Sequence, residues 1–202
     1  MAKRTTTSEV DLIKELGPET DLELRLLQQA EVQQGMLWGV PRYGHPEGEV
    51  FRHVKEVLDN IDALPDLDTS DRRKLRLIAF IHDTFKYKED KSVPRNWNYH
   101  HAVLARRYLA QFVDDEQLLN LVQYHDEIYY IWRDQVIFKE EERAAKRMAH
   151  LLKRIDGANQ LYYLFFKCDS CTGDKNPAPV QWVEENFPGI EPVYLPGDSP
   201  LR

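Results

Sequence analysis

The sequence predicts an all-α protein, and three observations lead to this prediction. Apolar residues recur at the spacing of one face of an α-helix through most of the chain. No segment alternates apolar and polar residues as a half-buried β-strand would. Short stretches rich in Gly and Pro separate the helical segments. With 202 residues, 42% of them hydrophobic, the chain is long enough for one domain with a substantial core.

The domain boundaries follow from where the helical spacing begins and ends. Residues 1–18 are predicted to form a flexible N-terminus that ends at a Gly-Pro pair. Residues 19–187 are predicted to form a single helical domain. Residues 188–202 are rich in proline and are predicted to form a short, extended and irregular C-terminal tail.

The first half of the domain contains two helical segments and one ordered loop before its central helix. Residues 19–35 have helical spacing and end at a glycine. The next segment, 36–50, is rich in Gly and Pro, and its Trp38 and Tyr43 indicate an ordered loop. Residues 49–64 form the second predicted helix, with apolar residues on one face.

The central helix is predicted over residues 69–87, because a Thr-Ser-Asp start can cap its N-terminus. Its apolar run ends in the sequence His82-Asp83. The remaining helices are predicted over 99–113, 114–132, 139–168 and 180–186. The longest of them, 139–168, is expected to be irregular at Gly157.

Composition argues against several classes of function. The formal net charge is −7 and the pI is near 5.5, so no general nucleic-acid affinity is expected, because that affinity needs a surplus of Lys and Arg. No apolar stretch approaches the ~20 residues of a membrane span. The basic N-terminus lacks an apolar signal core, so a cytoplasmic location is expected. Cys168 and Cys171 lack a thioredoxin-like setting and a second cysteine pair, which predicts two reduced thiols.

Several histidines lie on the apolar faces of their predicted helices, where residues three, four and seven positions apart share a face. They are His53, His82, His101 and His125. Any one of them alone is more simply explained as a core residue with a hydrogen-bond partner. Together they would each need a separate partner in the core, whereas one metal centre would satisfy them all.

Acidic residues accompany these histidines. A buried imidazole beside the buried carboxylate of Asp83 is costly unless both are compensated. Asp169 lies on the apolar face of the last long helix and is the preferred late carboxylate. Asp156 lies on a wetter face and is kept in reserve. A divalent ion would satisfy both kinds of ligand, and Mn, Fe, Co, Ni or Zn suits such a mixed set.

The order His53, then His82-Asp83, then Asp169 resembles the HD-domain superfamily of metal-dependent phosphohydrolases. The resemblance covers about residues 39–182. The segment "GHPEGEVFRHVKEVLDNID" resembles the opening of the HD domain appended to bacterial tRNA nucleotidyltransferases, and "CDSCTGDK" is similar to the late aspartate segment there. The "HDTFK" stretch also has the lysine of the family, Lys86.

This resemblance implies a helical bundle around one or two divalent metal ions. His53, His82, Asp83 and Asp169 would form the first site, and Asp83 could bridge two ions. His101 and His125 fall where two-metal members carry extra histidines. They would either bind a second metal or line the pocket, and the sequence leaves both alternatives open.

A phosphate substrate needs positive charge in addition to the metal. Lys86, one helical turn beyond the doublet, is the best candidate. Lys175 could close over the site from the late loop. Arg42, Arg52 and Arg106 could help, although a solvated surface charge is the simpler interpretation of each arginine.

Other residues near these positions could assist the reaction. Glu47 and Glu127 are candidates to donate a proton to a leaving oxygen or to orient a ligand histidine. His45 is a loop histidine without an assigned partner. The aromatic segments 128–132 and 161–166 could stack a nucleobase, although aromatic stripes on helices more often belong to the core.

The resulting interpretation is an enzyme, a cytoplasmic HD-type hydrolase of phosphomonoesters or phosphodiesters that uses metal-bound hydroxide. The expected substrate is small, phosphorylated and nucleotide-like. A homodimer is expected from the aromatic content. Two alternatives remain, namely a di-iron oxygenase on the same fold and a non-catalytic HD module that binds metal or ligand.

Overall fold

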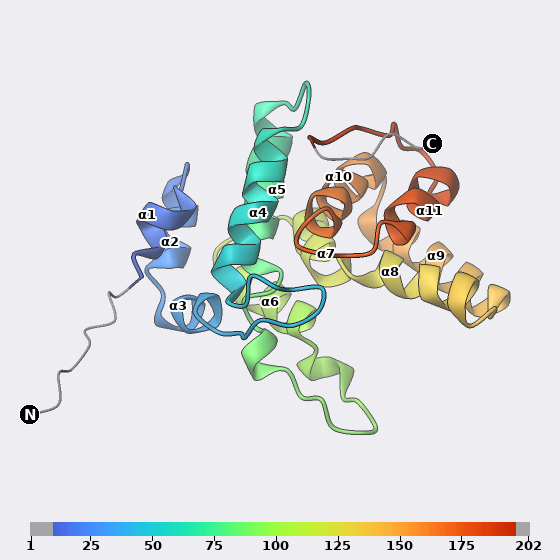
Figure 1. The fold of residues 1–202 in the computed structure, drawn as a ribbon, viewed down its shortest axis with the longest axis horizontal. Helices are drawn as coiled ribbons and strands as arrows, with labels where there is room; N and C mark the ends of the chain where they lie inside the picture. Colours follow the sequence, from blue (N-terminus) through green and yellow to red (C-terminus); the bar gives the residue numbers. More distant parts are fainter. Residues whose placement is uncertain (1–9, 197–202) are drawn as a thin grey trace, which may run out of the picture.

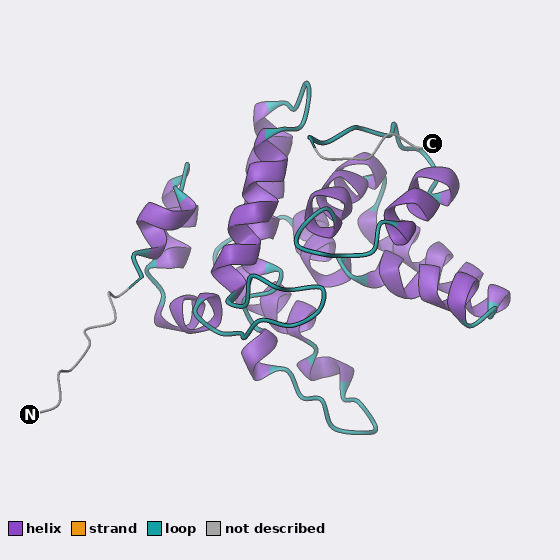
Figure 2. Ribbon diagram, viewed as in Figure 1, coloured by secondary structure: helices purple, strands orange, loops and turns teal. Residues whose placement is uncertain are grey.

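A computed structural model describes residues 10–196, and their secondary structure is helical (Figures 1 and 2). No β-strand occurs in this range; the only pairing of that kind is an isolated bridge between Arg42 and His45. The all-α prediction is confirmed. The α-helices are α1 (Leu12–Leu16), α2 (Asp21–Leu27), α3 (Ala30–Met36), α4 (Val50–Asp62), α5 (Thr69–Ile81), α6 (His101–Leu109), α7 (Glu116–Tyr124), α8 (Glu127–Trp132), α9 (Glu141–Ile155), α10 (Asn159–Ser170) and α11 (Ala178–Asn186).

Shorter helical segments connect some of these helices. Two are 3-10 turns, η1 (Lys86–Lys88) and η2 (Trp97–Tyr99), and one is a π-helical segment, η3 (Arg133–Ile137). The central helix α5 ends at Ile81, earlier than its predicted end at residue 87. It ends there because the chain turns at the His82-Asp83 doublet, and η1 follows this turn.

Three of the predicted helices are interrupted. The segment 19–35 is divided into α2 and α3, and 114–132 is divided into α7 and α8 at His125-Asp126. The segment 139–168 is divided into α9 and α10 at Asp156-Gly157, where an irregularity was expected. Asp156 adopts a left-handed backbone conformation with φ of 47°, which ends α9.

The two ends of the described chain pack onto the helices. Helix α1 lies within the segment predicted to be flexible, but Leu12 and Leu16 are buried and α1 packs against α4. Near the C-terminus, the amide of Gln160 donates to the carbonyl of Glu191, and the backbone N–H of Glu191 donates to Gln160. The N-terminal residues 1–9 and the last part of the predicted tail, 197–202, lie outside the described residues.

Helices α4, α5 and α10 pack on one another and form the centre of the molecule (Figure 1). The buried face of α4 carries Val50, Val54, Val57 and Ile61, at helical spacing. Helix α7 packs on both α5 and α6 and so joins α6 to this central group. Polar side chains that leave these inner faces therefore meet in one place.

Glycine allows a close approach beside the doublet. Gly35 of α3 faces the backbone after His82-Asp83, and a Cβ atom there would lie 1.9 Å from the carbonyl oxygen of Thr84. No other residue fits this contact, because every other side chain begins with a Cβ atom.

None of the helices within 10–196 combines the length and apolar character needed to cross a membrane.

Candidate metal centre

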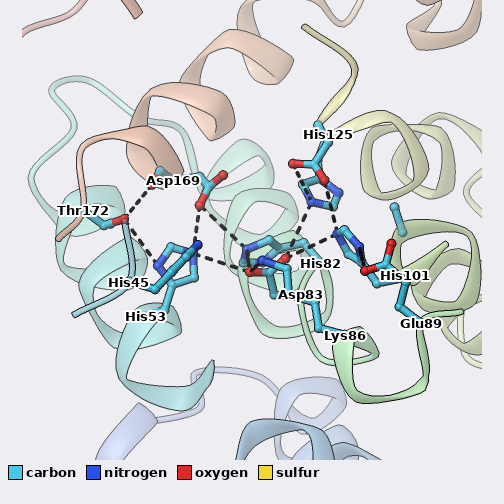
Figure 3. A network of polar contacts seen from close by, with 12 residues as sticks. His45, His53, His82, Asp83, Lys86, Glu89, His101, His125, Asp169 and Thr172 are labelled. Atoms are coloured by element: carbon cyan, nitrogen blue, oxygen red, sulfur yellow. Dashed lines mark hydrogen bonds and ion pairs between the residues drawn. The ribbon is translucent and has the colours of Figure 1, made fainter. Parts of the chain in front are cut away.

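Six side chains from five helical elements converge at the centre of the bundle (Figure 3). Each lies on, or directly at the end of, a helix whose apolar face is buried, so the polar atoms point inward. They are His53 of α4, His82 and Asp83 at the end of α5, His101 at the start of α6, His125 at the end of α7, and Asp169 of α10.

The first cluster contains His53, His82, Asp83 and Asp169. Nε2 of His53 lies 2.8 Å from Oδ1 of Asp169 and 3.9 Å from Oδ2 of Asp83. Nε2 of His82 lies 3.5 Å from the same Oδ2 atom and 3.9 Å from Oδ1 of Asp169. Two imidazole nitrogens and two carboxylates thus surround one point.

The second cluster uses the other oxygen of Asp83. Its Oδ1 atom lies 3.5 Å from Nε2 of His101 and 3.8 Å from Nε2 of His125. Asp126 completes this cluster, with 3.2 Å from Oδ2 to Nε2 of His101 and 3.4 Å from Oδ1 to Nε2 of His125. The sequence reasoning missed Asp126, although His125-Asp126 repeats the doublet pattern.

The histidine nitrogens that face the centre lack hydrogen-bond partners. The Nε2 atoms of His53, His82, His101 and His125 are buried without one, and the contact of His53 with Asp169 is short but lacks hydrogen-bond geometry. Unsatisfied buried nitrogens are costly unless something outside the protein binds them. Carboxylates and imidazoles are ligands of divalent metals, so this set fits metal ions.

Two of the rings are held in the form that a metal needs. Nδ1 of His82 lies 3.0 Å from the carbonyl of Ala79, and Nδ1 of His125 lies 2.8 Å from the carbonyl of Val122. A carbonyl only accepts, so Nδ1 carries the proton and donates it. Nε2 of the neutral ring therefore presents its lone pair to the centre. Burial lowers the pKa of His82 to about 3, which keeps that ring neutral.

Both predicted lysines reach the carboxylates of the centre. Nζ of Lys86 forms an ion pair with Oδ2 of Asp83, and Nζ of Lys175 lies 3.0 Å from Oδ1 of Asp169. Burial alone would raise the pKa of each carboxyl group, but the neighbouring ammonium and imidazole groups hold both pKa values well below their usual range. Asp83 and Asp169 are therefore anions at neutral pH.

Glu47 lies beside His53 on the outer side of the first cluster. Its Oε1 atom lies 2.9 Å from Nδ1 of His45 and 3.6 Å from Nδ1 of His53. The hydroxyl of Thr172 lies 3.3 Å from the same His53 nitrogen. Glu47 is thus the partner of His45, for which the sequence analysis assigned none. Glu47 also lies where it can orient His53.

Glu89 has the corresponding place beside His101. Its Oε2 atom lies 3.6 Å from Nδ1 of His101, and its Oε1 atom lies 3.6 Å from Nε2 of His100. Arg95 holds the same carboxylate at 2.7 Å. Burial would lower the pKa of His101, but Asp126 and Glu89 raise it to about 9. Sequence reasoning did not select Glu89, which follows η1 in a loop.

Two predicted carboxylates lie away from the centre. Glu127 forms a two-point ion pair with Arg147, at 2.6 and 3.0 Å, and it is not among the residues that line the cavity at the centre, so this arrangement does not support its predicted role as a proton donor or as a partner of a ligand histidine. Consecutive helical residues differ by about 100° in direction, and Glu127 therefore points away from its neighbour Asp126. The reserve candidate Asp156 is exposed at the end of α9 and does not reach the cluster.

Two of the three predicted arginines lie away from the centre. Arg52 pairs with Glu49 at 2.9 Å and Arg106 pairs with Glu116 at 2.7 Å, both at the surface. Arg42 differs from them, because it lines a small cavity together with His53 and Asp83 of the first cluster. The simpler interpretation of Arg52 and Arg106 as surface charges agrees with this arrangement.

A cavity of about 350 Å³ opens directly onto the centre. Its polar side is formed by Asp83, Asp126 and Asp169 together with Lys86 and Lys175. A small molecule can therefore reach both carboxylate clusters and both ammonium groups from the same opening.

Comparison with known proteins agrees with this arrangement. The family model of the HD domain matches residues 50–158, which is more than half of the chain. The chain belongs to the HD-domain family. No curated protein and no solved structure matches it. The HD-domain superfamily is one of metal-dependent phosphohydrolases that bind divalent metals. In this HD domain the match includes both histidine–aspartate doublets, whereas Asp169 lies beyond it.

Proposed function

We propose that this HD domain is a metal-dependent phosphohydrolase that acts on a small, nucleotide-like phosphoester. The observation that carries the proposal is the arrangement of the four buried Nε2 atoms around the two oxygens of Asp83. The cavity that reaches this arrangement also contains two lysines, which suit a phosphate group.

We infer that the two clusters could hold two divalent ions. His53, His82, Asp83 and Asp169 would hold the first ion, and Asp83, His101, His125 and Asp126 would hold the second. When bound, such ions supply Lewis acidity toward a phosphoryl oxygen and lower the pKa of water. Mn, Fe, Co, Ni and Zn all suit this ligand set.

The side chains of the chain itself position the substrate. Lys86 and Lys175 line the cavity, and their ammonium groups would contact the phosphate oxygens. Each ammonium lies against a carboxylate of the centre, which fixes its position before the substrate arrives. The hydroxyl of Thr172 and the carbonyls of Ala79 and Val122 lie within hydrogen-bond distance of Nδ1 of three of the imidazoles and hold them in place.

The proposal is tested with protein purified without chelator. Metal content per chain is measured by mass spectrometry, and a panel of phosphomonoesters and phosphodiesters is assayed after reconstitution with each candidate metal. We expect hydrolysis by the natural chain and by Asp156→Asn, and background hydrolysis by Asp83→Ala. Undiminished hydrolysis by Asp83→Ala, with the protein shown to be pure, would overturn the proposal.

A second candidate function is a di-iron oxygenase. It is supported by the four histidines and by the single carboxylate that the two clusters share. About two irons per chain, together with oxygen uptake in the presence of an organic substrate, would favour it over hydrolysis. The two lysines that line the cavity favour the phosphohydrolase.

A further inference from the structure

The cavity above the metal centre has an aromatic side that holds no metal ligand. Tyr129 and Trp132 lie three residues apart on α8 and both line the cavity. Their rings are stacked, with centroids 5.6 Å apart and planes 29° apart. Tyr43 lines the cavity from the loop before α4. We call these three side chains the aromatic wall.

The aromatic wall is only partly used by the core. The ring of Trp132 is buried, but Tyr129 is 40% exposed and Tyr43 is 84% exposed. In the same helix, Ile128 and Ile131 are fully buried, so the core contact of α8 is made by residues on another face. The segment 128–132 therefore lies only partly in the core, and the exposed ring of Tyr129 is available to stack a planar group, the role that the sequence left open for this segment.

We propose that the aromatic wall binds a planar ring of the substrate by stacking, while a single phosphate of the same molecule lies at the metal centre. This inference rests on the proposed phosphohydrolase function and specifies its substrate. The cavity volume of about 350 Å³ suits one small molecule with a ring and a phosphate. Stacked aromatic side chains are surfaces on which heteroaromatic rings bind.

The charges of the cavity select for one phosphate. Among the residues that line it, the cationic side chains are Lys86 and Lys175, and both lie at the metal centre. A second or third phosphate would find no further cation among these lining residues, because Arg133, whose guanidinium lies 5.9 Å from the ring centroid of Tyr129, is not one of them. Unpaired charge in a partly enclosed site is unfavourable, so polyphosphates should bind less well.

The test compares binding of three probes to the metal-loaded protein. The probes are a nucleoside monophosphate, ribose 5-phosphate without a base, and the matching nucleoside triphosphate. Affinity is measured by calorimetry and by quenching of tryptophan fluorescence, with turnover followed in the same samples. We expect the monophosphate to bind about tenfold more tightly than ribose 5-phosphate, because stacking of one base has about this value.

Variants of the aromatic wall make the test specific. Tyr129→Leu should reduce the preference for the nucleoside monophosphate over ribose 5-phosphate to near one, while Tyr129→Phe should keep it, because the ring remains. Tyr43→Leu removes an exposed ring and should reduce the preference without disturbing the core. Tyr194→Leu, at an exposed tyrosine outside the cavity, is the matched control and should leave the preference unchanged.

The outcomes separate this inference from the proposed function. Equal affinity for the nucleoside monophosphate and ribose 5-phosphate in the natural chain would overturn the stacking role, even if both are hydrolysed. A preference retained by Tyr129→Leu and Tyr43→Leu would overturn it too. A triphosphate that binds as tightly as the monophosphate would overturn the single-phosphate selection. Tight, ring-dependent binding without any turnover would support the aromatic wall and contradict the phosphohydrolase.

Discussion

Asp83 and Asp126 face the same imidazole, with Oδ1 of Asp83 at 3.5 Å and Oδ2 of Asp126 at 3.2 Å from Nε2 of His101. Each aspartate follows a histidine that ends a helix, and each of those histidines places Nδ1 against the carbonyl three residues earlier. The chain therefore builds the same helix-terminal doublet twice, at His82-Asp83 and at His125-Asp126. The two copies meet at one centre.

Removal of metal should lower thermal stability. A ligand at 100 times its Kd stabilises the folded state by about 2.7 kcal/mol. For a chain of this size we expect the melting temperature to fall by about 5–10 °C when a chelator removes the ions. Calorimetric melting before and after chelation, and again after metal is restored, measures this. An identical melting temperature in all three samples would contradict binding at the buried centre.

Asp126→Asn should weaken the second ion selectively. Only the second cluster contains Asp126, whereas Asp169 contacts only the first. We expect the metal content to fall from about two ions per chain to about one in Asp126→Asn and also in Asp169→Asn. In the variant that carries both substitutions it should fall to near zero. Asp156→Asn changes an exposed aspartate and should keep the full metal content. Two ions retained in Asp126→Asn would remove that residue from the ligand set.

Glu89→Gln should loosen the second ion through His101. The glutamate lies 3.6 Å from Nδ1 of His101 and contacts no ligand oxygen of the centre. Loss of such a carboxylate typically costs about 10–100-fold in metal affinity. Titration calorimetry with Mn²⁺ would measure a weaker second binding step and an unchanged first step. Glu116→Gln, which alters a surface ion pair with Arg106, is the control. Equal weakening of both steps would indicate general loss of structure instead.

Gly35→Ala should destabilise the protein beside the first doublet. Its new Cβ atom would lie 1.9 Å from the backbone oxygen of Thr84, so either α3 or the turn after Asp83 must move. Overpacking of this kind costs about 1–3 kcal/mol. Urea unfolding of Gly35→Ala and of Gln34→Ala, an exposed neighbour on the same helix, compares the two free energies of unfolding. Equal stability would show that the backbone approach is not tight.

The sequence predicted the inward histidines because helical spacing relates His53, His82, His101 and His125 to buried faces. Asp169 was preferred over Asp156 on the same ground, and it is the one that reaches the centre. Helical spacing is local, however, and it applies only while the helix continues. It does not report where α7 or α9 ends.

The remaining residues of the centre depend on features that local spacing does not carry. Glu89 and Thr172 approach their histidines from loops, whose paths are set by packing between distant segments. Asp126 could have been recognised, because it repeats the doublet at a helix end. Glu127 was selected for its nearness in sequence to His125, but one further residue in a helix changes the direction of the side chain.

The break between α9 and α10 at Asp156-Gly157 has a consequence for how this chain tolerates change in length. In one continuous helix, a single inserted residue would rotate everything after it by about 100° and would carry Asp169 out of the centre. Because the break separates the two helices, the rotational phase of α10 is independent of the residue count in α9. A residue added at the exposed turn Asp156-Gly157 would therefore not impose this rotation on α10, and the aspartate could stay in register with its histidines.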